Sequence, residues 1–133
     1  LLSKRLRHPY FGKIGRLTGK VQFGETLEEA AQRELYEESG LNANKFVLEQ
    51  IYHKMRYKDD GTFVQDNLFY RFFSSDVSGN FISKTKHQEN LWLTQTDLET
   101  GDFDTFGDLK LDKRTTPNKF HFIEDKKQLK DKY

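Results

Sequence analysis

Three glutamates that lie close together in the sequence, Glu34, Glu37 and Glu38, have the residue type and the spacing to do chemistry. Residues three and four apart lie on the same side of an α-helix, so a helix here holds the three carboxylates together. Neighbouring carboxylates repel one another, and burying them unpaired is costly. Either basic residues such as Arg33 neutralise the cluster or a cation binds to it. The chain has no cysteine and the cluster has no histidine nearby, so its oxygen ligands favour a hard divalent cation, Mg²⁺ above all.

The helix that must position these carboxylates is predicted from Leu27 to Ser39. Thr26 followed by Glu29 forms a capping box, which places the N-cap at Thr26. The segment contains no Gly or Pro and is rich in good helix formers. Gly40 follows directly and is placed to end the helix in a left-handed conformation.

The inner face of this helix is unusual because two carboxylates fall within its apolar stripe. At about 100° per residue, Glu34 and Glu38 lie in the stripe and Glu37 lies at its border. A run of charge is usually a solvent-facing surface, and for the helix considered alone that alternative stays open. The stripe itself consists of Leu27, Ala31 and Leu35.

The sequence of the loop before the helix favours a cation-binding site over a solvent-facing charged surface. The spacing runs from Gly19 over five residues to Glu25, then over seven residues to Arg33-Glu34-Leu35, Glu37-Glu38 and Gly40-Leu41. These nine specified positions over 23 residues match every fixed position of the Nudix box, a far more specific signal than a lone glycine motif. The chain therefore resembles the Nudix hydrolases, and among them the MutT-type variety.

The resemblance implies a fold and a reaction. The expected fold class is α/β, as the Nudix α/β/α sandwich with a central mixed β-sheet. The implied reaction is metal-dependent hydrolysis of the phosphoanhydride in a nucleoside diphosphate linked to another group, X. A nucleoside triphosphate, oxidised or normal, giving a monophosphate and pyrophosphate, ranks first. ADP-ribose, nucleotide sugars and dinucleoside polyphosphates are the alternative substrates, and a non-catalytic nucleotide-binding module is the alternative class.

The resemblance also implies the metal ligands. Glu34, Glu37 and Glu38 would bind Mg²⁺, with Mn²⁺ as a substitute. The backbone carbonyl of Thr18 or Gly19 would complete the ligand shell. Thr18 stands where many family members have a second glycine, which puts the local backbone geometry in question but leaves the carboxylates unaffected.

The same resemblance names the catalytic residues. Arg33 would orient the carboxylates, through Glu25 or Glu37. A water molecule would be deprotonated by Glu34, by Glu37, or by Glu89, which is expected in the loop before a Trp-containing strand. The box does not decide which of these is the base.

Residues outside the carboxylate cluster are predicted to bind the substrate. Arg5, Arg16 and Lys20 are basic residues that could attract a polyphosphate, although an exposed basic surface is an equal alternative for Arg5. Asp66 and Asn67 interrupt an aromatic run and could read a base edge. Hydrogen bonding within the sheet is the alternative for these two residues.

The rest of the chain predicts a strand at 46–57, a turn at 58–61 and a return strand at 62–73. Residues 42–44 are expected to form a connection, 74–80 a turn and 84–90 a polar loop. Residues 94–102 are expected to begin a helix. A long Phe-rich strand edge leaves both a monomer and a homodimer open.

Bulk properties exclude several classes of protein. The length of 133 residues suits one domain over 1–133, with its first strand expected before Leu1 and a polar C-terminal extension at 118–133. A net charge of +1 argues against a general nucleic-acid or membrane-surface binder, and no apolar run approaches membrane-spanning length. The absence of cysteine fits a reducing cytoplasm. The expected partner is a small nucleotide.

Overall fold

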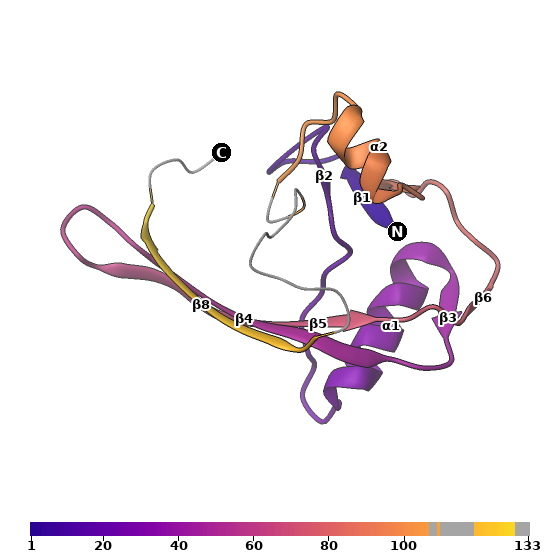
Figure 1. Cartoon of the computed structure of the whole chain (residues 1–133), viewed down its shortest axis with the longest axis horizontal. Coiled ribbons are helices and arrows are strands. Elements are labelled where there is room, and N and C mark those ends of the chain that lie inside the picture. The colour runs from indigo at the N-terminus through magenta and orange to yellow at the C-terminus, as the bar shows by residue number, and fades with distance from the viewer. Residues whose placement is uncertain (107–108, 110–118, 130–133) are drawn as a thin grey trace. The chain divides into compact units, whose positions relative to one another are not determined.

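The computed structural model describes residues 1–106, 109 and 119–129 (Figure 1). By its internal contacts the chain divides into two compact units, each built from two segments. Among the described residues, no helix has the length and apolar character needed to cross a membrane. The first unit comprises Leu1–Asn44 and Ser75–Arg114, and the second comprises Lys45–Ser74 and Thr115–Tyr133.

The first unit contains a three-stranded antiparallel sheet in the order β2-β1-β7. Its central strand, β1 (Leu2–Arg5), pairs with β2 (Ile14–Gly15) on one side and β7 (Gln88–Leu91) on the other. One hydrophobic core belongs to this sheet and to the short helix α2 (Gln95–Thr100), which begins with its own capping box at Thr94. The buried core residues are Leu2, Ile14, Leu98 and Leu109, and Leu91, Leu93 and Phe103 pack against them.

Helix α1 (Leu27–Ser39) has the predicted bounds. The Thr26 hydroxyl accepts a hydrogen bond from the Glu29 amide at 3.1 Å, and the Glu29 carboxylate accepts one from the Thr26 amide at 2.7 Å. Gly40 has a φ of 73°, the left-handed conformation in which glycine is favoured. The predicted helix and both of its ends are therefore confirmed.

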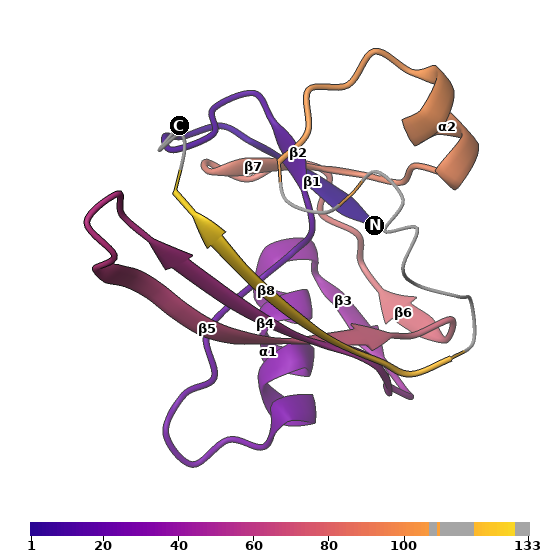
Figure 2. The ribbon, with the colours of Figure 1, turned by 60° about the vertical axis from the view of Figure 1, so that its left-hand side comes forward.

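The second unit is a mixed three-stranded sheet in the order β5-β4-β8. Strands β4 (Val47–Tyr57) and β5 (Phe63–Phe73) form the predicted hairpin, and β8 (His121–Gln128) pairs with β4 in parallel (Figure 2). Strand β5 lies at an edge of this sheet, as expected for the Phe-rich strand. The oligomeric state of the protein stays a prediction.

Three local predictions were wrong, each because a pairing partner lies far away in the sequence. Residues expected to form a connection and a turn instead pair as β3 (Leu41–Ala43) and β6 (Val77–Gly79), which are too short to show an alternating pattern. Glu89, expected in a loop, lies within β7, whose polar sequence hid the strand. The expected polar extension at 118–133, which includes β8, stays a prediction.

His53 connects all three strands of the second unit. Its Nε2 lies 2.6 Å from Asp66 Oδ1 on β5, and its Nδ1 lies 3.3 Å from Glu124 Oε1 on β8. The hydrogen bond to Asp66, and next the one to Glu124, raise the pKa of His53 above its usual 6.5. The protonated imidazole therefore links a hairpin strand and the C-terminal strand to β4.

This linkage predicts a pH-dependent stability. A raised folded-state pKa gives a stabilisation that is fully present below about pH 6.5 and is lost as pH rises through the folded value. We expect the unfolding midpoint of the wild type to fall relative to that of His53→Gln between about pH 5.5 and about pH 8.5. Thermal unfolding followed by circular dichroism measures the difference, with His87→Gln as the control for removing an imidazole elsewhere. Parallel pH profiles for wild type and His53→Gln would contradict it.

Candidate active site

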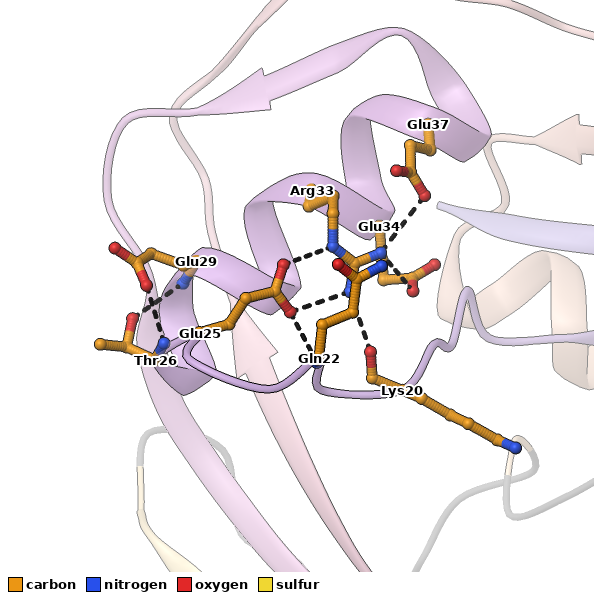
Figure 3. Close-up of polar contacts among 8 residues, drawn as sticks. All are labelled: Lys20, Gln22, Glu25, Thr26, Glu29, Arg33, Glu34 and Glu37. Atoms are coloured by element: carbon orange, nitrogen blue, oxygen red, sulfur yellow. Dashed lines mark hydrogen bonds and ion pairs between the residues drawn. The ribbon is translucent and has the colours of Figure 1, made fainter.

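The guanidinium of Arg33 lies at the centre of the acidic cluster (Figure 3). Its Nε and Nη2 donate to the two oxygens of Glu25 at 2.5 and 3.0 Å, and its Nη1 donates to Glu34 at 2.8 Å and to Glu37 at 3.3 Å. Nη2 also donates to the backbone carbonyl of Lys20 at 2.8 Å. Arg33 therefore joins the loop before α1 to two carboxylates of the helix itself.

Hydrogen bonding to Arg33 lowers the pKa of Glu25, with a further contribution from the Gln22 amide, which donates to Glu25 at 2.8 Å. In return, the bonds to Glu25 and then to Glu34 raise the pKa of Arg33, which is charged in any case. The loop from Lys20 to Glu25 is thus held against α1 by one bidentate ion pair and by the hydrogen bond from Arg33 to the Lys20 carbonyl.

Gly19 allows the backbone to pass beside Glu34. A Cβ atom at this position would lie 1.7 Å from the carboxyl carbon of Glu34, so any larger residue would displace that side chain. The close approach of Glu34 therefore explains why glycine, which has no side chain, fits at this position of the box. It brings the main chain of the loop close to a carboxylate that the resemblance assigns to the metal.

Glu38 is different from the other glutamates of the cluster. Its Oε2 atom is buried and has no hydrogen-bond partner in the described part of the chain. Burial, followed by the charge of Glu34, raises the pKa of Glu38 to about 7, with a smaller contribution from Glu37. A buried carboxylate oxygen without a partner, beside two other carboxylates, is an arrangement that a cation would stabilise.

These residues fit a divalent cation by their chemistry. The donors are all oxygens, which hard cations prefer. Within residues 1–106, 109 and 119–129, however, no three acidic or histidine side chains converge closely enough to hold a metal as they stand. Arg33 holds Glu34 and Glu37 in ion pairs. Ligation by the three glutamates and by the carbonyl of Thr18 or Gly19 stays a prediction.

Two of the three predicted phosphate-binding residues, Arg5 and Lys20, interact with this cluster. Arg5 lies at the end of β1, donates to the Pro9 carbonyl at 2.7 Å, and lowers the pKa of Glu38 by its charge. Lys20 contributes its backbone carbonyl to Arg33, whereas its ammonium group extends away from the carboxylates (Figure 3). Arg16 is exposed.

Asp66 and Asn67 lie on β5 in the second unit. Asp66 is bound to His53, which is the hydrogen bonding within the sheet that the sequence left as its alternative role. Asn67 is exposed and lies opposite Lys54 in the β4–β5 register. Recognition of a base by these two residues stays a prediction.

Glu89 lies on β7 between Gln88 and Asn90. Neighbouring side chains in a strand point to opposite faces, so Glu89 lies on the face opposite to these two residues. Asn90 donates to the Glu38 carbonyl at 2.7 Å, and the Gln88 side chain hydrogen-bonds the Glu38 carboxylate. The structure thus brings Gln88 and Asn90 to the cluster, and sequence reasoning missed both. Their spacing of two residues was the only available signal, and the unrecognised strand concealed it.

Comparisons with known proteins identify the family. The family model described as the NUDIX domain matches residues 1–117. The chain belongs to the Nudix family. Members of this family generally use divalent metal ions, and the expectation of a Nudix-type hydrolase is confirmed at the level of the family.

Two relatives resemble short parts of this Nudix domain. The chain is 52% identical over 44 residues, 33% of its length, to the oxidized purine nucleoside triphosphate hydrolase of Danio rerio. It is 51% identical over 47 residues, 35% of its length, to the NAD-capped RNA hydrolase of Schizosaccharomyces pombe. The matches span only 28% and 12% of the lengths of those two proteins, respectively.

A solved structure supports the fold. The crystal structure of the mutator MutT protein from Bacillus halodurans superimposes with a TM-score of 0.62 at 20% identity. The match covers 76% of this chain and 64% of that one. At this identity the likeness concerns the fold alone, and it confirms the expected α/β Nudix fold.

The contacts of Arg33 generate a prediction about the loop. In Arg33→Lys the charge remains, but the planar fork that binds Glu25 through two nitrogens is lost. We expect the Gln22 amide, which Glu25 holds, to exchange its hydrogen roughly tenfold faster. Hydrogen exchange followed by NMR measures this rate, and Arg7→Lys, an exposed arginine of the preceding loop, is the matched control. Unchanged protection of Gln22 would show that Arg33 does not hold the loop.

Proposed function

We propose that this Nudix domain hydrolyses the phosphoanhydride of a nucleoside diphosphate linked to another group, with Mg²⁺ or Mn²⁺ as its cofactor. The observation that carries the proposal is the buried Oε2 of Glu38 beside Glu34, which has no hydrogen-bond partner among the described residues and lies within a complete Nudix box. A solvated acidic helix would have its carboxylate oxygens in water. This one keeps an oxygen buried among like charges, where a cation is the fitting partner.

Four groups would hold the cation. The charge of Glu34 affects Glu38 more than that of Glu37 does, Glu37 lies at the border of the same face, and the main chain at Gly19 passes beside Glu34. The Thr18 carbonyl is the alternative to that of Gly19. When bound, a divalent cation neutralises phosphate charge and lowers the pKa of a bound water.

The side chains then have distinct tasks. Arg33 holds Glu34 and Glu37 in fixed positions. A carboxylate, from Glu34, Glu37 or Glu89, takes a proton from water as the water oxygen bonds to phosphorus. The anhydride P–O bond breaks, and its electron pair leaves with the departing phosphate. Arg5, Arg16 and Lys20 are the basic residues proposed to offset the negative charge of the substrate.

The favoured substrate is a nucleoside triphosphate, oxidised or normal, which gives a monophosphate and pyrophosphate. The similarity to a relative named as an oxidized purine nucleoside triphosphate hydrolase supports it. The second candidate is a dinucleotide joined through a diphosphate, supported by a similarity of the same strength to a relative named as an NAD-capped RNA hydrolase. ADP-ribose and nucleotide sugars share that diphosphate linkage.

A panel assay tests the function. Wild-type protein with Mg²⁺ is incubated with oxidised and normal nucleoside triphosphates, ADP-ribose, NAD, sugar nucleotides and diadenosine polyphosphates, and the phosphate products are identified. We expect turnover of at least one triphosphate with release of pyrophosphate. Glu38→Gln removes a charged ligand worth several kcal/mol in the transition state, so we expect roughly 100-fold or greater loss of kcat.

Glu28→Gln is the matched control, because Glu28 is an exposed glutamate in the first turn of the same helix. It should retain the wild-type rate. If the wild type turned over none of these compounds and bound a nucleotide as well as Glu38→Gln does, the domain would be a binding module and the enzyme proposal would fail.

A further inference from the structure

Asn90 uses its whole side chain in hydrogen bonds around Glu38. It lies on β7 and is only 3% exposed. Its Nδ2 donates to two backbone carbonyls, that of Glu38 at 2.7 Å and that of Ile82 at 2.7 Å. Its Oδ1 accepts from Nε2 of Gln88 at 2.8 Å. A buried amide with both hydrogens used and its oxygen occupied is held in one orientation.

The carbonyl of Glu38 is one that α1 cannot satisfy itself, because the last four carbonyls of a helix have no partner within it. The neighbouring carbonyls are tied as well. Ser39 O accepts from the Ile82 amide at 2.8 Å, and Tyr36 O accepts from the Gly40 amide at 2.8 Å. The other two partners are backbone amides, whereas Asn90 binds through its side chain and fixes the last turn of α1 to β7.

Asn90 also reaches the other end of Glu38. Gln88, which donates to Asn90, hydrogen-bonds the Glu38 carboxylate as well. A side-chain amide carries two donor hydrogens, so Gln88 can serve both partners. Asn90 thus contacts Glu38 directly at its main chain and through Gln88 at its carboxylate, and in the part of the chain that the structure describes the Oε2 atom has no partner.

We infer that Asn90 is a positioning residue for the Glu38 carboxylate, holding it in the orientation that leaves Oε2 available to a cation. Without these contacts the Glu38 side chain would sample several staggered rotamers, and binding a cation would require ordering it. The inference rests on the proposed metal-dependent function. It concerns residues outside the Nudix box, since Asn90 and Gln88 lie far along the chain from it.

The test measures metal binding without substrate. Mn²⁺ is titrated into the full chain, and free Mn²⁺ is followed by electron paramagnetic resonance. Residues that hold a metal ligand in place typically change affinity by roughly 10–100-fold when mutated. We expect Asn90→Ala to weaken Mn²⁺ binding about tenfold. Asn42→Ala is the matched control, because Asn42 also hydrogen-bonds α1, accepting from Gln32 at 3.1 Å, but has no bond to Glu38.

A second measurement separates positioning from general stability. If Asn90 acts through Glu38, then Asn90→Ala should have no further effect on Mn²⁺ affinity in a Glu38→Gln background. A loss caused by general destabilisation would instead add to that of Glu38→Gln. Gln88→Ala removes the contact to the carboxylate and the hydrogen bond to Asn90 Oδ1 but leaves the bond from Asn90 to the Glu38 carbonyl, and we expect it to weaken Mn²⁺ binding in the same direction by less.

Each outcome decides a different point. A wild type that binds no Mn²⁺ overturns the metal-dependent function, and this inference with it. A wild type that binds Mn²⁺, with Asn90→Ala folded and binding equally well, overturns the inference alone. An additive loss in the Glu38→Gln background also overturns it. If Asn90→Ala does not fold, Gln88→Ala decides, and an unchanged affinity in that variant overturns the inference.

Discussion

The ion pairs of Arg33 are the interaction on which the site depends. One helix face carries several carboxylates, and like charges at this spacing repel one another. The Arg33 guanidinium supplies donors in a fixed plane, and it binds Glu25, Glu34 and Glu37 at once. The same group reaches the Lys20 carbonyl, so the charges that would separate the loop from the helix instead hold the two together.

This arrangement divides the acidic cluster into two parts. Arg33 compensates the negative charges of Glu25, Glu34 and Glu37. Glu38 has no bond to Arg33, and its pKa is raised by burial and by the charge of Glu34. Glu38 is held from the other side, by Gln88 and Asn90 of β7. An uncompensated carboxylate that is nevertheless well anchored is what a cation site requires, because the ligand is then ordered before the cation arrives.

The parts of the structure that could be predicted from the sequence are those determined by local interactions. The capping box at Thr26 and the glycine at position 40 determine α1, and the turn at 58–61 determines the β4–β5 hairpin. The pairing of β3 with β6 and of β4 with β8 could not be predicted, since each depends on contacts between residues distant in the chain. For the same reason the box residues were found and Asn90 was not. Its partner in α1, Glu38, lies 52 residues away, and no local pattern encodes that contact.

The position of the glutamates within α1 also has a physical meaning. The C-terminus of a helix carries partial negative charge, so acidic side chains there are unfavourable and basic ones favourable. Helix α1 has no basic residue in its last turn, yet Glu37 and Glu38 lie close to that end. Stability alone would place these glutamates in the first turn, where Glu28 and Glu29 lie. Local rules are typically broken where function requires it. A bound cation would offset both the mutual repulsion of the carboxylates and their unfavourable interaction with the helix end, so the electrostatics of the helix and the proposed metal site have one common explanation.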